Sequence, residues 1–299
     1  MCSLRLVPKE NHLIREAFID FILSRQAALL SPSTIEFYKY TAGFFVDYII
    51  SQGVFEPEEI STNLVRAYLI EVNNRGVADA TVHAHARGTR AFLSFLNEDG
   101  YISTPINIKM PCVEQKKMRV LSPDEMKQIL KVCKKPRDKA LILFLIDSGL
   151  RRSEACSLNW IDVDIPSGVV NIRRSKNKKA RSVFIGVKTR RALLRYRRTI
   201  SHDDIDPVFQ TQADTRLKPS GLRQVIRRMS EKSGISFSAH DLRRTFATLS
   251  LKAGMNVLHL QSLLGHSSLE MTRRYVQMVK DDLSEAHRSH GPIDTFLNK

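Results

Sequence analysis

Three clusters in the second half of the chain combine residue types suited to phosphate chemistry. The segments are S-G-L-R-R-S-E at 148–154, H-D-L-R-R at 240–244 and G-H-S-S at 265–268, with Tyr275 on the following predicted helix. The pattern predicts a helix that ends at Gly149 and another that begins at once, which places Arg151 at a surface between them. His240 and Arg243 are spaced i, i+3 and should share a helix face. A histidine and an arginine on one helix face are well suited to bind the same anion.

These residue types fit attack on a phosphodiester. A guanidinium group binds phosphate oxygens with paired hydrogen bonds, which lysine cannot do. A tyrosine hydroxyl, with an ordinary pKa near 10, is a weak nucleophile at neutral pH and needs a base or cationic surroundings. The sequence has no carboxylate pair at ligand spacing and no phosphate-binding G-x-x-x-x-G-K-[ST] segment, so we expect neither metal nor ATP to be needed.

Taken singly, each cluster also has a purely structural interpretation. Arg151 and Glu154 could form an ordinary ion pair at a helix end, and the segment 240–244 could be a basic helix surface. Tyr275 could be an amphipathic surface or core residue. A DNA-binding protein without catalysis therefore stays open at this level.

Taken together, the clusters resemble the tyrosine recombinase (phage integrase) family. The resemblance extends to H-D-L-R-R-T-F-A-T at 240–248, L-G-H-S-S at 264–268, T-R-R-Y at 272–275 and the basic hairpin S-K-N-K-K-A-R at 175–181. The order Arg, Lys, His-x-x-Arg, His, Tyr is that of the family. The short N-terminal segment makes the chain look like Xer-type enzymes or compact integrases of mobile elements.

The resemblance implies a role for each matched position. Tyr275 corresponds to the nucleophile that forms a 3′-phosphotyrosine and releases a 5′-hydroxyl. Arg151 and Arg243 correspond to the two arginines that clamp the scissile phosphate. His240 corresponds to the histidine assigned to proton transfer with the tyrosine, and His266 to the histidine that hydrogen-bonds the phosphate.

The hairpin lysine is harder to assign from the resemblance. Lys176 is the best match for the lysine that protonates the leaving 5′-oxygen, with Lys178 and Lys179 as alternatives, because the glycines common in this hairpin are absent. Glu154 is expected to stand behind Arg151 and orient it.

Helical periodicity dominates the first hundred residues, where no strand-like alternation occurs. We therefore predict an all-helical core DNA-binding domain over 1–100, similar in kind to the core-binding domain of the family. Prolines and cations interrupt 101–120, which we interpret as a linker.

The remaining chain, 121–299, is predicted to be the catalytic domain with a C-terminal tail. Ser122 and Glu125 form a capping box before a helix. Three short strand-like segments at 161–164, 169–174 and 181–185 predict a small antiparallel sheet, and the chain is predicted to be helical again from Val187. The fold class is thus mainly α with a small antiparallel β-sheet: a helical N-terminal domain and an α+β tyrosine-recombinase catalytic domain.

The chain is strongly basic, with 47 lysine and arginine residues against 31 aspartate and glutamate residues, a net charge of +16. Such an excess favours nucleic acid as partner. A basic stripe formed by Arg191, Arg195 and Arg198 is also suited to phosphate contacts. The other candidates for DNA contact are Arg87, Arg90, Arg173, Lys178, Lys179, Arg181, Arg223 and Arg227.

We predict a site-specific recombinase that acts on double-stranded DNA as a homotetramer, without cofactor or metal. A second recombinase or a directionality factor stays open as a further partner, and a type IB topoisomerase-like nicking-closing enzyme is the alternative that keeps the chemistry.

The longest apolar segment is far too short to span a bilayer and the four cysteines are widely spaced. We therefore expect a cytoplasmic, nucleoid-associated protein with no membrane partner. The C-terminal tail could dock on a neighbouring protomer or fold back on its own domain.

Overall fold

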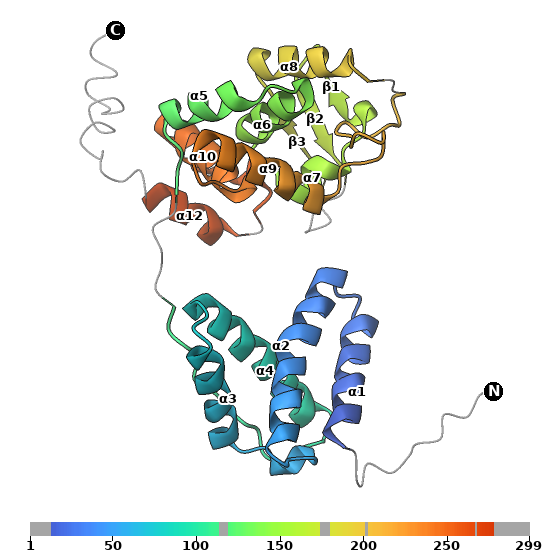
Figure 1. Ribbon diagram of the computed structural model, residues 1–299, viewed down its shortest axis with the longest axis vertical. Helices are drawn as coiled ribbons and strands as arrows, with labels where there is room; N and C mark the ends of the chain where they lie inside the picture. Colours follow the sequence, from blue (N-terminus) through green and yellow to red (C-terminus); the bar gives the residue numbers. More distant parts are fainter. Residues whose placement is uncertain (1–12, 114–118, 174–179, 201–202, 267, 278–299) are drawn as a thin grey trace, which may run out of the picture. The chain divides into compact units, whose positions relative to one another are not determined.

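The computed structural model describes residues 13–113, 119–173, 180–200, 203–266 and 268–277. Contacts within the chain divide it into two compact units, 1–116 and 117–299 (Figure 1). The assignment of the first hundred residues as a DNA-binding domain stays a prediction. Among the described residues, no helix is both long enough and apolar enough to cross a bilayer.

Over residues 13–113, the first unit is built from helices and contains no strand. They are α1 (Ile14–Ala27), α2 (Pro32–Ser51), the short 3₁₀ helix Pro57–Glu59, α3 (Thr62–Asn74) and α4 (Asp79–Glu98). Ser31 begins α2 by accepting a hydrogen bond from the Thr34 amide, with Pro32 at the first helical position. Gly88 of α4 lies so close to α2 that an added methyl group would overlap Thr41. Close packing of these two helices therefore depends on glycine at this position.

The second unit contains helices around one small sheet. Its helices are α5 (Pro123–Val132), α6 (Pro136–Ser148), α7 (Arg152–Ser157), the 3₁₀ helix Trp160–Asp162, α8 (Val187–Arg197), α9 (Pro219–Ser233), α10 (Ala239–Lys252), α11 (Val257–Leu264) and α12 (Leu269–Gln277). The strands β1 (Val163–Asp164), β2 (Val169–Ile172) and β3 (Arg181–Phe184) form an antiparallel sheet in the order β1-β2-β3. The predicted fold class, mainly α with a small antiparallel sheet, is confirmed.

Two details of the second unit differ from the sequence prediction. The segment predicted as a strand from 161 begins as a 3₁₀ turn, so that β1 is only Val163–Asp164. The segment after Asp203, predicted to be helical up to Pro207 and beyond it, instead pairs in isolated bridges, Asn159 with Pro207 and Gln210 with Arg216. The Val208 amide donates to the Leu158 carbonyl. These partners are distant in sequence, so local periodicity could not reveal them.

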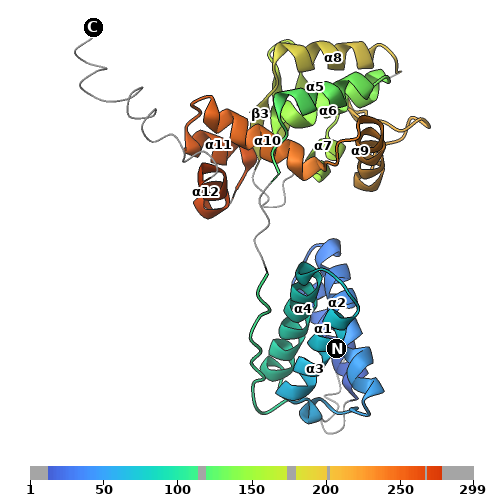
Figure 2. The same ribbon diagram turned by 60° about the vertical axis from the view of Figure 1, so that its left-hand side comes forward.

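One apolar core holds the second unit together and extends from Leu121 to Leu242. A smaller cluster of Ala247, Leu260, Leu264 and Tyr275 joins α10, α11 and α12. These three helices lie side by side in Figure 2. The cluster therefore fixes the helix that carries Tyr275 against the helix that carries Arg243.

Candidate active site

The turn between α6 and α7 presents Arg151. Gly149 adopts a left-handed backbone conformation, φ +61°, and an added Cβ would overlap the ring of Phe246. Only glycine satisfies both conditions without strain. Leu150 is buried, and Arg151 follows as the residue that caps α7.

Glu154 is the buried anion of the site. Its side chain is 3% exposed and accepts hydrogen bonds from the Arg151 amide at 2.9 Å and from Arg151 Nη1 at 3.1 Å. Arg181 donates to both of its oxygens, at 3.0 and 2.8 Å. Burial alone would raise the pKa of Glu154, but the hydrogen bonds from Arg181 and Arg151 hold the pKa below its ordinary value. Glu154 is therefore charged at neutral pH and binds two arginines, not only Arg151 as predicted.

Arg181 does not project outward as the predicted DNA contact. Its side chain is 10% exposed, pairs with Glu154 and donates from Nε to the Leu263 carbonyl at 2.8 Å. The strand pattern explains this position, because Arg181 alternates with buried Val183 and so faces the interior. Its guanidinium group is occupied inside the fold by Glu154 and the Leu263 carbonyl, and a contact of Arg181 with DNA stays a prediction.

Arg243 lies deeper than any other arginine of the site, at 2% exposure. Its Nη1 donates to the Gly149 carbonyl and its Nη2 to the Leu264 carbonyl, both at 2.7 Å. Burial, and then the charge of Arg151, lower the pKa of Arg243 to about 10. The group remains protonated at neutral pH.

The end of α11 gathers three arginines on consecutive carbonyl groups. Arg181 binds the Leu263 carbonyl, Arg243 that of Leu264 and Arg151 that of Gly265, the last at 3.3 Å. The last carbonyl groups of a helix lack partners in the helix and carry its negative dipole end, so guanidinium donors stabilise them. The turn that leads into His266 is thereby tied to α7, β3 and α10.

His266 and Tyr275 face each other beyond this turn. Gly265 ends α11 in a left-handed conformation, φ +62°. The Nδ1 atom of His266 lies 2.9 Å from the hydroxyl of Thr272, and its ring stacks on that of Tyr275 with centroids 6.2 Å apart. Burial, and then Arg243 and Arg151, lower the pKa of His266 to about 4, so the ring is neutral at neutral pH. The Tyr275 side chain is 5% exposed.

His240 occupies the first turn of α10 and is exposed, whereas Arg243 on the same helix is buried. Loss of part of its hydration, and then the charges of Arg244 and Arg243, lower the pKa of His240. Its ring is therefore neutral at neutral pH and can accept a proton. No hydrogen bond joins it to Arg243 in the described part of the chain.

The remaining predicted residues lie apart from this cluster or outside the described residues. Lys176, Lys178 and Lys179 belong to the segment 174–179, which the structure does not describe. Arg173 Nε lies 2.6 Å from Asp162, with the arginine side chain 65% exposed. The other predicted DNA contacts are exposed and stay predictions: Arg87 and Arg90 on α4, and Arg223 and Arg227 on α9.

The described part of the site offers no metal centre. Among the described residues, no three His, Cys, Asp or Glu side chains gather closely enough to hold a metal ion. Its charges are those of arginines and one buried glutamate. These arginines, with the neutral histidines, can bind an anion and transfer a proton, and the phenol of Tyr275 lies beside His266.

The chain is similar to known proteins over most of its length. The model of the phage integrase family matches residues 119–281. The chain is 30% identical over 288 residues to tyrosine recombinase XerA of Saccharolobus solfataricus, covering 92% of each. It is similar to the crystal structure of XerA recombinase at 26% identity and a TM-score of 0.52, covering 93% of this chain and 99% of that one.

A further solved structure shares the fold at lower identity. The Tn1549 transposon integrase, solved with transposon right end DNA, superimposes with a TM-score of 0.75 at 18% identity, covering 93% of this chain and 99% of that one. The family model matches more than half of the chain, and the match to XerA of Saccharolobus solfataricus covers 92% of it. This chain therefore belongs to the phage integrase family and is a tyrosine-type site-specific recombinase.

Proposed function

We propose that Tyr275 attacks a DNA phosphodiester, forming a 3′-phosphotyrosine and releasing a 5′-hydroxyl, and that the reverse reaction joins a new strand. The observation that carries the proposal is the turn at 263–265, where three guanidinium groups converge beside the stacked rings of His266 and Tyr275. A phosphate placed there meets cations and a nucleophile at once. The bond energy is kept in the phosphotyrosine, so rejoining needs no ATP.

Arg151 and Arg243 are proposed to hold the scissile phosphate. A guanidinium group has five N–H donors. Protein acceptors take two from the side chain of each arginine, which leaves three on each for phosphate oxygens. Both groups are held in place before DNA arrives, so charge that develops on the phosphate in the transition state is stabilised without reorganisation.

The two histidines are proposed to have different tasks. His240 is neutral and can accept the proton that the Tyr275 hydroxyl loses. His266 is neutral as well, and a Thr272 hydroxyl that donates to Nδ1 would leave Nε2–H to donate to a phosphate oxygen. Lys176, or Lys178 or Lys179 in its place, is proposed to protonate the leaving 5′-oxygen.

The DNA partner and the assembly are proposals of the same kind. The net charge of +16 and the exposed arginines on α4 and α9 suit contacts with both units. Exchange between two duplex sites requires four strand cleavages, which a homotetramer supplies with one tyrosine each. We propose that this happens in the cytoplasm, on the nucleoid.

The test uses nicked duplexes that trap the covalent intermediate, run on a denaturing gel. Wild-type protein should give a slow protein–DNA band that is insensitive to chelator, and Tyr275→Phe should give none while binding the DNA equally. Covalent trapping by Tyr275→Phe at the wild-type level would overturn the assignment. A substrate with two sites then distinguishes recombination from mere nicking and closing, because only recombination yields molecules with exchanged flanks.

A further inference from the structure

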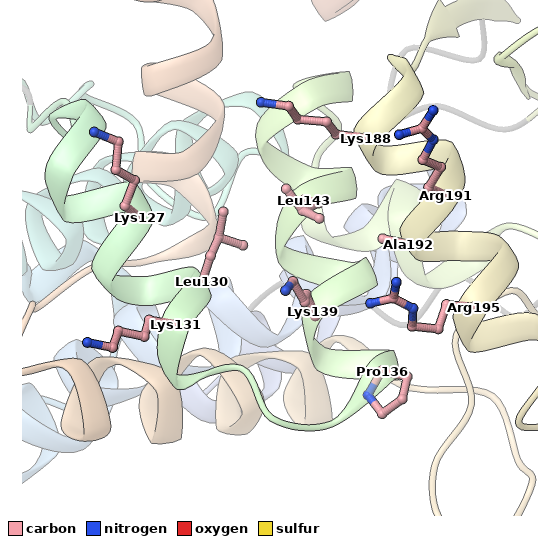
Figure 3. A pocket seen from close by; sticks show the side chains of 10 residues that line it. All are labelled: Lys127, Leu130, Lys131, Pro136, Lys139, Leu143, Lys188, Arg191, Ala192 and Arg195. Carbon is pink, nitrogen blue, oxygen red and sulfur yellow. The ribbon is translucent and has the colours of Figure 1, made fainter.

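A basic groove lies on the second unit between α5, α6 and α8 (Figure 3). Its volume is about 480 Å³, within the range of protein ligand pockets. Leu130, Leu143, Ala192 and Pro136 form its apolar floor. We call it the α5–α8 groove; its cationic rim consists of Lys127, Lys131, Lys139, Lys188, Arg191 and Arg195.

The rim charges are largely uncompensated. Lys127 pairs with Asp124. Within the part of the chain that the structure describes, no ion pair joins any of the other five cations to a carboxylate, and no acidic residue lines the groove. In Figure 3, Arg191 and Arg195 reach from α8 toward α6, and Lys127 and Lys131 stand at the opposite edge. Six cations around one apolar floor favour an anionic partner that also has apolar groups.

The α5–α8 groove is separate from the candidate active site. In both Figure 1 and Figure 2, α8 lies on the side of the second unit away from α12, the helix that carries Tyr275. None of the residues that line the groove belongs to the candidate active site. The stripe of Arg191 and Arg195, which the sequence suggested for phosphate contact, points into the groove.

We propose that the α5–α8 groove binds an acidic amphipathic helix of a partner protein. Its walls are helices and no strand lines it, so the partner cannot bind by adding a strand to a sheet edge. A helix with leucine or phenylalanine at i, i+3 or i+4 and i+7, flanked by glutamates, would fill the floor and reach both rims. DNA offers phosphates to the rim but has no aliphatic side chain for the floor.

The test measures binding of labelled peptides to the full chain by fluorescence anisotropy at about 0.15 M salt. One synthetic peptide of about five helical turns has a leucine face flanked by glutamates, and a second has the same composition in scrambled order. The groove variant is Arg191→Glu with Arg195→Glu. The matched control is Lys232→Glu with Lys252→Glu, which makes the same change in net charge at exposed lysines outside the groove.

We expect the amphipathic peptide to bind at least about tenfold more tightly than the scrambled one, because only ordered leucines fill the floor. The groove variant should weaken binding by about tenfold, and the control by less than about threefold. Equal binding of both peptides, or equal loss in both variants, would reduce the effect to net charge and overturn the proposal.

Two further probes test the other possible occupants. A duplex of random sequence should bind the groove variant and the control variant equally, and a loss confined to the groove variant would make the groove a nucleic-acid surface. A peptide of residues 278–299 of this chain should bind more weakly than the amphipathic peptide. Tighter binding of that segment would assign the groove to the chain's own tail and overturn the proposal of a separate partner.

Discussion

Arg181 is predicted to be a positioning residue whose loss weakens the fold and the reaction together. Replacement of Arg181 by Gln removes three hydrogen bonds, two to Glu154 and one to the Leu263 carbonyl. Breaking a buried ion pair by removing one partner costs about 3–5 kcal/mol. Glu154 keeps Arg151 as a partner, so we expect the lower end, about 3 kcal/mol of unfolding free energy. For a unit of this size, that loss corresponds to a fall in Tm of about 6–12 °C.

Urea unfolding of the full chain measures this cost directly. Trp160 is the one tryptophan of the sequence and is buried in the second unit, so its fluorescence reports on that unit. Arg198→Gln is the matched control, since Arg198 is exposed, and it should change stability by less than about 0.5 kcal/mol. Arg181→Lys should fall between wild type and Arg181→Gln, because an ammonium group cannot bind both carboxylate oxygens in the same geometry.

The pH dependence of this cost has a definite sign. Because the pKa of Glu154 is depressed in the folded chain, its contribution is complete above the ordinary carboxyl pKa and is lost as the pH falls through the depressed value. The difference between wild type and Arg181→Gln should therefore shrink in acid. A difference under about 1 kcal/mol at pH 7, or one that grows as the pH falls below about 4, would contradict a stabilising Arg181–Glu154 ion pair.

Three further predictions concern the turns and the helix cap. Gly265→Ala should destabilise the chain by about 1–3 kcal/mol and slow covalent complex formation, because φ is +62° and the new Cβ would lie 2.9 Å from the Arg181 guanidinium group. The control is Gly53→Ala, which is also at positive φ but in open space. It should cost about 1 kcal/mol in a thermal melt and leave DNA cleavage unchanged. His266 should lower the free energy of unfolding by up to about 3 kcal/mol as the pH falls from about 6.5 toward 4, because the unfolded chain takes up the proton first. In urea titrations at a series of pH values, His266→Asn should reduce this dependence of stability on pH. Ser122→Ala should cost about 1 kcal/mol in the same assay, since it removes the side-chain acceptor that caps α5, and an unchanged midpoint would contradict the cap.

Local signals predicted the helical elements well. The Ser122–Glu125 capping box identified a helix start that the structure reproduces, because capping depends on neighbours within a few residues. Gly149 likewise ends a helix as the sequence indicated, in a left-handed conformation.

The parts that sequence analysis missed depend on contacts between distant residues. The placement of Arg181 inside the fold follows from Glu154, 27 positions earlier, and from a carbonyl 82 positions later. The alternation of Arg181 with Val183 was the available signal, but its basic hairpin suggested a surface instead. The irregular segment after Asp203 similarly depends on pairing with Asn159.

The most direct measurement is the chemical identity of the covalent bond. After trapping on a nicked duplex, the complex is digested with nuclease and trypsin, and the nucleotide-bearing peptide is sequenced by mass spectrometry. Trypsin cleaves after Arg274 and Lys280, so we predict a phosphonucleotide on Tyr275 in the peptide 275–280. An adduct on any other residue, or trapped DNA that survives in Tyr275→Phe, would contradict the proposed site.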